Sequence, residues 1–430
     1  MTLNLSSPSV RWLLIFDGFY AAVIAFCYVT GRSATTTLSI VAAGACLLIW
    51  QLALAWRAHR GTMVLQVIPN IRMPHYFQAA VQGCHYIYLG LYYEHIVDYV
   101  PMIVVQIVTA YLLEMLLSWS RGRAWQAGFG PFPVIGSINL FLWFKPEYFY
   151  CQLLLVAFAA LTKEFVRWDR DGRSSHIFNP SAIALAATAV ILLAADATTM
   201  TTGVNHILAY EVPPNFFEVM FLFGLLLQVF FSTTLITLGA VIALSIIFYG
   251  GLFTLGEPLL FFIFHINVFL GLNLLATDPA TSPRPQFGKF LFGLTWGTAI
   301  WCCYVFLSWL ELPSYYDKIL TVPIVNLMVP LFDRIGRRVR IPFQDRRFVY
   351  IALYIGLFTL ILPRLKTPDD ESDYYLKGKL PRPAAYESWK SLRLHRERDR
   401  FCTSFPRACE PWGLLEEIRH YREFGNRSPD

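Results

Sequence analysis

Long apolar segments alternate with short polar loops along most of the chain. An α-helix rises 1.5 Å per residue, so about 20 apolar residues are needed to cross the hydrocarbon core of a bilayer. Thirteen segments reach or approach that length: residues 12–30, 37–56, 77–96, 101–118, 131–144, 148–166, 177–195, 215–232, 234–251, 258–276, 287–309, 319–333 and 348–363. Those at 131–144, 319–333 and 348–363 are short enough to be tilted, re-entrant or interfacial. The pattern therefore predicts an all-α polytopic membrane protein with about 11–13 transmembrane helices.

The composition agrees with a membrane protein. Apolar residues make up 56% of the chain and charged residues only 15%, against roughly 25% charged residues in soluble domains. The net charge of +6 comes from short basic loops rather than from a nucleic-acid-binding surface, so we expect no nucleic-acid partner. By the positive-inside rule these loops are cytoplasmic. They contain Arg57, Arg60, Arg72, Arg121, Arg123, Lys163, Arg167, Arg170, Arg173, Arg284, Lys289, Arg334, Arg337, Arg338, Arg340, Arg346 and Arg347. We expect a multi-pass protein in the lipid bilayer of the bacterial inner (cytoplasmic) membrane.

The polar tail, residues 364–430, has a location that depends on the last apolar segment. If 348–363 spans the membrane the tail lies outside the cytoplasm, and if this segment lies in the interface the tail is cytoplasmic. We expect a span, because flanking arginines can extend to the headgroups and offset its short length. In an oxidising compartment Cys402 and Cys409 could then form a disulfide.

Two polar stretches interrupt the apolar pattern, Ser174–Ala182 and Ala276–Pro283. Each adjoins a membrane-length segment, where irregular backbone is tolerated only if it is buried in protein or lines a cavity. Ordinary turns are the alternative, since Asn-Pro and Asp-Pro commonly begin turns. We expect Asn179 and Asp278 to lie in helix breaks, with side chains that hold neighbouring backbone or a ligand.

Ionisable residues within apolar segments are candidates for function, because burying a charge in a membrane is costly. Glu114 lies near the inner end of its segment and is either a functional carboxylate or one at a helix end. For Glu164, which follows Lys163, we expect a local ion pair. His265 and Asn267 either line a pathway or bond to a neighbouring helix.

Three histidines, His75, His85 and His95, recur every ten residues among tyrosines. On a helix they would be about 15 Å apart, which is too far for one mononuclear metal site. Interfacial positions explain them better than a pair of stacked cofactors. We therefore predict no metal site.

A threonine-rich run, Asp196-Ala197-Thr198-Thr199-Met200-Thr201-Thr202-Gly203, follows the segment 177–195 on the face opposite to the basic loops. Threonine clusters after a helix usually form turns or caps. Considered alone, this run predicts a helix cap.

These features together resemble the RnfD/NqrB family, the membrane subunits of ion-translocating redox complexes. The similarity extends from about Met73 to Arg334. Its parts are Pro74-His75, Glu114, Lys163, Phe178-Asn179-Pro180-Ser181-Ala182, Ala276-Thr277-Asp278-Pro279-Ala280-Thr281-Ser282-Pro283, Gly288, Phe290-Leu291-Phe292-Gly293 and Ile324–Asp333. The resemblance divides the chain into two additional N-terminal helices (1–64), a family-like domain (65–335), a basic loop with the final apolar segment (336–363), and the tail (364–430).

The resemblance implies a bundle like that of urea and ammonium channels, with two inverted halves, and a bound FMN or other flavin. Family members carry FMN esterified to a threonine in a motif that Asp196, Thr199 and Thr202 match. Ala197, Met200 and Thr201 differ from it, replacing both glycines and the alanine. The family's flavin-bearing threonine corresponds to Thr202. Further residues expected near a cofactor are Lys163, His176, Asn179, Thr277, Asp278, Thr281 and Ser282.

The resemblance implies an electron-transport subunit of an ion-translocating oxidoreductase, which relays electrons through flavin to partner membrane subunits. Cation translocation would accompany this relay. The alternative is a flavin-free channel, transporter or scaffold subunit that retains only the fold.

Overall fold

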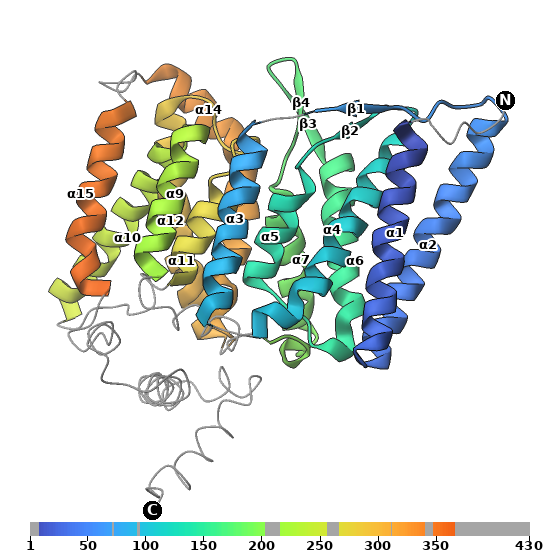
Figure 1. The fold of residues 1–430 in the computed structure, drawn as a ribbon. Helices are drawn as coiled ribbons and strands as arrows, with labels where there is room; N and C mark the ends of the chain where they lie inside the picture. Colours follow the sequence, from blue (N-terminus) through green and yellow to red (C-terminus); the bar gives the residue numbers. More distant parts are fainter. Residues whose placement is uncertain are drawn as a thin grey trace, which may run out of the picture. The chain divides into compact units, whose positions relative to one another are not determined.

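The computed structural model describes residues 8–70, 73–92, 95–202, 216–255, 266–310, 312–339 and 347–365, which are mainly helical (Figure 1). The expectations for His265, for the tail and for its Cys402 and Cys409 lie outside these residues. The chain forms two compact units, one of residues 1–90 and 94–185 (unit 1) and one of residues 91–93 and 186–430 (unit 2).

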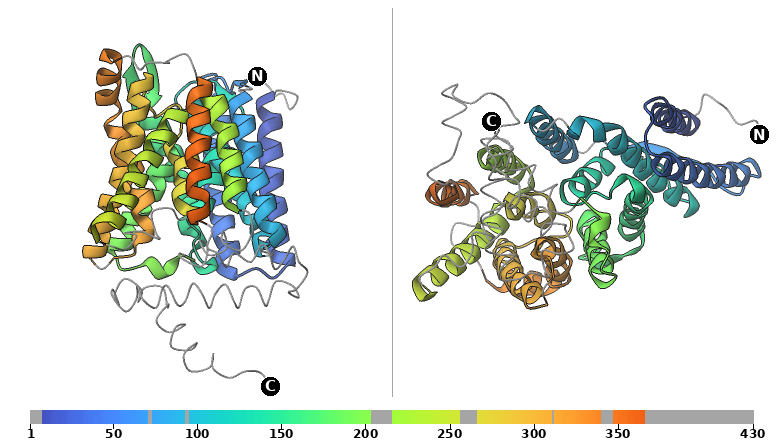
Figure 2. Two further views of the ribbon diagram at one scale, coloured as in Figure 1. Left: turned by 90° about the vertical axis from the view of Figure 1, so that its left-hand side faces the viewer. Right: turned by 90° about the horizontal axis from the view of Figure 1, so that it is seen from below.

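Unit 1 is a set of helices that run side by side, with short strands at one end (Figures 1 and 2). Its helices are α1 (Pro8–Val29), α2 (Ala34–His59), α3 (Met73–Tyr92), α4 (His95–Ser120), α5 (Pro131–Phe141), η1 (Pro146–Tyr148), α6 (Phe149–Phe165) and the start of α7 (Pro180–Ala194). Strands β1 (Val67–Pro69) and β2 (Trp125–Ala127) pair in parallel, and β3 (Arg167–Arg170) and β4 (Arg173–His176) form an antiparallel hairpin.

Unit 2 contains the rest of α7 and a series of helices with several interruptions. They are η2 (Thr198–Met200), α9 (Phe216–Phe231), α10 (Thr234–Leu255), α11 (Ile266–Leu270), η4 (Gly271–Ala276), α12 (Gln286–Trp309), η5 (Ser314–Tyr316), α13 (Asp317–Leu327), α14 (Val329–Arg338) and α15 (Arg347–Leu365). The segment η4 is a π-helix, a wider turn that is rare in proteins and frequent at functional sites.

Each of the thirteen predicted apolar segments contains helix within its described residues. Among those residues, four helices are long and apolar enough to cross a membrane: Ser9–Val29, Ala34–His59, Ile96–Ser120 and Gln286–Trp309. A fifth is added if α13 and α14, which meet at a bend of 58°, count as one broken span. The helices therefore indicate a membrane protein.

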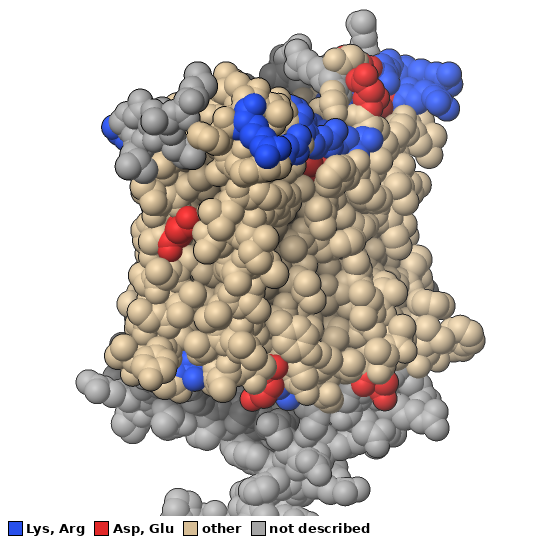
Figure 3. Space-filling view, turned by 90° about the vertical axis from the view of Figure 1, so that its right-hand side faces the viewer, with Lys and Arg blue, Asp and Glu red and all other residues tan. Residues whose placement is uncertain are grey.

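The basic loops of unit 1 lie at one end of its helices, as the positive-inside pattern predicts. The indole nitrogen of Trp50 donates to the Ser120 hydroxyl over 3.0 Å, which brings the second half of α2 beside the end of α4. Trp119 donates to the carbonyl of Gln66 over 2.9 Å in the loop that follows α2. Figure 3 shows Lys and Arg side chains gathered toward the upper end of one face, above a broad band almost free of charge.

A carboxylate that is not among the predicted site residues lies inside this unit. Asp17 is half-buried near the middle of α1, and its Oδ1 accepts a hydrogen bond of 3.0 Å from Nε2 of the buried Gln51 on α2. An amide partner satisfies one carboxylate oxygen without neutralising its charge.

Helices α10 and α12 of unit 2 pack with their backbones in direct contact, because three glycines face across the interface. A Cβ on Gly297 would lie 2.8 Å from the carbonyl oxygen of Ala240. Cβ atoms on Gly239 and Gly293 would overlap the carbonyl oxygens of Phe290 and Ile236. Small residues spaced four apart, as at Gly293 and Gly297, allow such close approach of membrane helices.

Candidate functional site

The run Asp196–Thr202 begins as the C-terminal cap of α7. Asp196 has a positive φ of 51°, the N–H of Ala197 donates to the carbonyl of Leu192 over 2.8 Å, and the N–H of Asp196 donates to that of Leu193 over 3.4 Å. This pair of bonds around one left-handed residue is the Schellman motif. Asp tolerates this conformation because its short polar side chain can bond locally. The geometry supports the helix-cap interpretation of the run.

The remaining threonines form a single tight turn. The N–H and the hydroxyl of Thr201 both donate to the carbonyl of Thr198, over 3.2 and 2.9 Å, and Met200 N–H donates to Ala197. Thr199 is exposed, Thr201 buried and Thr202 half-buried. Since the N–H groups of Asp196, Ala197, Met200 and Thr201 already have backbone partners, the run fits a cap better than a cradle for a flavin phosphate.

Asn179 caps the N-terminus of α7, as expected of a residue in a helix break. Its Oδ1 accepts bonds from the Ser181 N–H at 3.0 Å, the Ser181 hydroxyl at 2.7 Å and the Ala182 N–H at 3.3 Å. Pro180 occupies the first helical position, where no N–H is needed. The buried Asn179 side chain thus holds neighbouring backbone. His176 lies in β4, opposite Arg167 of β3.

Asp278 organises the second polar stretch as a partly buried turn in unit 2. Its Oδ1 accepts from the Ala280 N–H at 3.1 Å, and its Oδ2 from the Thr281 hydroxyl at 3.0 Å. Its carbonyl accepts from the Ser282 hydroxyl at 2.7 Å, and the Thr277 hydroxyl bonds back to Asn273. Thr277, Asp278, Thr281 and Ser282 therefore act together to end the π-helical segment before α12.

Replacing Asp278 by Ala is expected to damage folding far more than replacing Gln286 by Ala. The substitution removes two hydrogen bonds to a carboxylate, from the Ala280 N–H and the Thr281 hydroxyl, and each is worth about 1.5–3 kcal/mol. Gln286 is half-buried at the first position of α12 and serves as the control. Unfolding midpoints in detergent compare the two variants, and equal tolerance would make Asp278 an ordinary turn residue.

The same turn is bonded to the broken span α13–α14. Asn326 Nδ2 donates to the carbonyl of Thr281 over 3.2 Å, and the N–H of Arg284 donates to Asp333 Oδ1 over 2.8 Å. The start of α13 is also close to the start of η4, because a Cβ placed on Gly271 would lie 3.6 Å from the Cβ of Lys318. Two interrupted helices therefore run alongside one another in unit 2. Interrupted helices of this kind form substrate and ion sites in many transporters.

A buried ion pair begins this broken span. Lys318 Nζ lies 2.8 Å from Asp317 Oδ1, and the two side chains are only 6% and 2% exposed. Among the described residues, the Tyr315 hydroxyl and the Trp296 indole nitrogen are buried without a hydrogen-bond partner. Trp296 lies against Gly271, as Lys318 does, so these polar groups share one region of unit 2.

This pair is a candidate functional site because it is poorly explained by stability. The cost of desolvating two charges often exceeds the attraction between them. Ionisable residues inside membrane segments therefore usually belong to pathways for ions or protons. The hydropathy pattern does not reveal the pair, because the predicted apolar segment begins at residue 319. Two adjacent charges directly before an apolar segment were the available signal.

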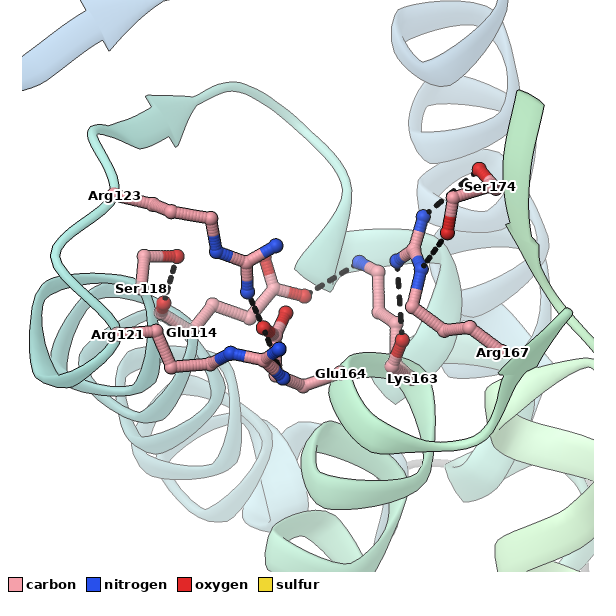
Figure 4. Close-up of polar contacts among 8 residues, drawn as sticks. All are labelled: Glu114, Ser118, Arg121, Arg123, Lys163, Glu164, Arg167 and Ser174. Atoms are coloured by element: carbon pink, nitrogen blue, oxygen red, sulfur yellow. Dashed lines mark hydrogen bonds and ion pairs between the residues drawn. The ribbon is translucent and has the colours of Figure 1, made fainter. Parts of the chain in front are cut away.

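Unit 1 carries a second charged group at the ends of α4 and α6, shown in Figure 4. Lys163 Nζ bonds to Glu114 Oε1 at 2.5 Å, so Glu114 forms an ion pair at a helix end. Glu164 forms an ion pair as expected, but its partners, Arg121 at 3.3 Å and Arg123, are distant in the chain rather than local. Arg167 bonds to the hydroxyl and carbonyl of Ser174 across the β3–β4 hairpin.

The structure brings together only some of the residues expected around a cofactor. Thr277, Asp278, Thr281 and Ser282 share one turn, whereas Asp196 belongs to the cap of α7, Thr199 to the turn η2, and Thr202 comes after that turn. Lys163, His176 and Asn179 lie in unit 1, each with a separate structural setting.

Comparisons with family models, curated proteins and solved structures found no match to the chain. The resemblance to the RnfD/NqrB family therefore stays an expectation from the motifs.

Proposed function

We propose that the chain is a multi-pass protein of the bacterial inner membrane that moves a small cation or protons across the bilayer. The buried Asp317–Lys318 pair of unit 2 is the site where the moving charge is bound. This is the channel or transporter alternative of the sequence analysis, and it is compatible with a place in a larger membrane complex.

The observation that carries the proposal is the position of the pair in the interrupted helices. The pair begins a span that bends by 58°, and Lys318 lies beside the first residue of the π-helical segment. A carboxylate held by a neighbouring lysine can exchange that partner for an incoming cation or proton. The buried Tyr315 hydroxyl and Trp296 N–H lie in the same region of unit 2. Broken helices supply the irregular backbone that such a site requires.

The test is charge movement in liposomes that contain the purified full chain. An imposed membrane potential should drive uptake of protons or sodium, followed with an internal indicator, and the double variant Asp317→Leu/Lys318→Met should abolish it. The matched control is Lys145→Gln/Glu147→Gln, a lysine and a glutamate that are both exposed at η1 of unit 1. Flux no greater than in empty liposomes, or equal flux in both variants, would contradict the proposal.

A flavin-carrying electron-transport subunit is the second proposal. It is favoured by the match of Asp196, Thr199 and Thr202 to the family motif. A bound flavin would supply one-electron chemistry, and Thr202 is the residue that would hold it.

If the redox proposal holds, the protein coexpressed with a flavin transferase is yellow, and Thr202→Ala removes the flavin fluorescence that survives denaturation. Thr298→Ala is the control, because the exposed Thr298 hydroxyl bonds only to the carbonyl of Leu294 in its own helix. A wild-type protein that lacks visible flavin absorbance would rule out the redox role and leave the flux experiment unaffected.

A further inference from the structure

The outer face of α6 in unit 1 carries an unbroken stripe of exposed apolar side chains. Leu154, Phe158, Leu161 and Phe165 are 64%, 40%, 41% and 58% exposed. Their spacings of four, three and four residues place them on one side of the helix. Such a stripe on a membrane helix is a surface for lipid acyl chains.

The stripe ends directly beneath two arginines. The guanidinium of Arg121 lies 5.2 Å from the centre of the Phe165 ring, the last residue of the stripe. Arg123 reaches the same place through its ion pair with Glu164, the residue before Phe165. The Arg121 and Arg123 side chains are 44% and 49% exposed, so both are open to solvent or headgroups.

The arginines are not neutralised by their protein partner. Both approach a single oxygen of Glu164, so two positive charges share one carboxylate (Figure 4). The other carboxylate of the group, Glu114, is bonded to Lys163. Burial and, to a smaller extent, the neighbouring cations Arg121 and Arg167 lower the pKa of Arg123. Each guanidinium has five N–H donors, more than one shared carboxylate oxygen can use.

We propose that Arg121, Arg123 and the α6 stripe form a binding site for one anionic phospholipid. The phosphate of the headgroup bonds to the two guanidinium groups, and an acyl chain lies along Phe165, Leu161, Phe158 and Leu154. A neutral phospholipid is a poorer ligand, because its own cation offsets the phosphate. A soluble phosphate is also a poorer ligand, because it leaves the stripe uncovered.

The experiment measures lipid binding to the full chain in neutral detergent by native mass spectrometry. Phosphatidylglycerol and phosphatidylcholine with the same acyl chains are compared, and glycerol phosphate is the soluble competitor. We expect Arg121→Gln/Arg123→Gln to weaken phosphatidylglycerol binding about fivefold for each arginine removed. The control Arg57→Gln/Arg60→Gln removes the same charge at the end of α2 in the same unit and should leave this binding unchanged.

Glu164→Gln provides the decisive second variant. It releases both arginines from their carboxylate, so it should raise the affinity for phosphatidylglycerol, whereas arginines that serve only to hold Glu164 would predict no gain. Phe158→Ala/Leu161→Ala should weaken the binding of both lipids. Equal losses of phosphatidylglycerol binding in the two double arginine variants would show that a diffuse surface potential attracts the lipid. Equal affinity for phosphatidylglycerol and phosphatidylcholine would show that the headgroup charge has no role. Strong competition by glycerol phosphate would show a site for a soluble anion. Each of these outcomes would overturn the proposal.

Discussion

Replacing Asp317 alone by Asn is expected to destabilise the protein by about 3–5 kcal/mol, because it leaves the Lys318 ammonium buried without a counter-charge. Both side chains are almost wholly inaccessible, so water cannot take over the role of the carboxylate. Unfolding in detergent, followed by tryptophan fluorescence, measures the loss.

The double variant Asp317→Leu/Lys318→Met should behave in the opposite way. Apolar residues of similar volume remove both desolvation costs together, so stability should be unchanged or raised by about 1–4 kcal/mol. If the pair served only to stabilise the fold, Asp317→Leu/Lys318→Met would be at least as unstable as Asp317→Asn. Loss of flux in a variant that folds well would separate function from stability.

Replacing Gly293 by Ala is expected to cost about 3 kcal/mol or more, the upper end for overpacked sites. The added Cβ would overlap the carbonyl oxygen of Ile236, and the nearest atoms belong to backbone, which cannot rotate away as a side chain can. Helices α10 and α12 would have to move apart along their whole contact. The measurement is the midpoint of unfolding in detergent.

Two glycines in other helices provide the control for this substitution. Gly18 in α1 and Gly356 in α15 have no heavy atom within 4 Å of an added Cβ. Alanine there should be neutral or stabilise its helix by up to about 1 kcal/mol. Similar midpoints for Gly293→Ala and Gly356→Ala would show that the α10–α12 contact is looser than the structure indicates.

The positions of the helices could be predicted from the sequence because hydrophobicity along a membrane segment is a local property. The limits of prediction from hydropathy appear at residues 319–333, where the chain forms α13 and α14 with a bend at Met328. Pro330 at the start of α14 signals a new helix, yet the size of the bend depends on contacts such as Arg284 with Asp333. These contacts join residues 49 apart, and hydropathy does not report them.

The local roles of polar residues were also predictable where the partner is close in the chain. Asn179 and Asp278 bond to groups two or three residues away, as Asn and Asp do in caps and turns. The partner of Lys163 was not predictable, because Glu114 is 49 residues distant and Glu164 is adjacent. The pair Asp317–Lys318 was overlooked for the opposite reason. Its members are neighbours, but only folding shows that both are buried.

The hydrogen bond between Asp17 and Gln51 has a consequence for the synthesis of the protein. An aspartate near the centre of an inserting helix opposes its transfer into lipid by roughly 2.5–3.5 kcal/mol. Gln51 leaves the ribosome 34 residues after Asp17, so Asp17 reaches the insertion machinery before its partner has emerged. We expect α1 to remain at the protein-conducting channel until α2 emerges, and the two helices to enter the bilayer together as a hairpin. The first irreversible step of assembly would then be the release of this hairpin, with its carboxylate already hydrogen-bonded, rather than the insertion of one helix at a time.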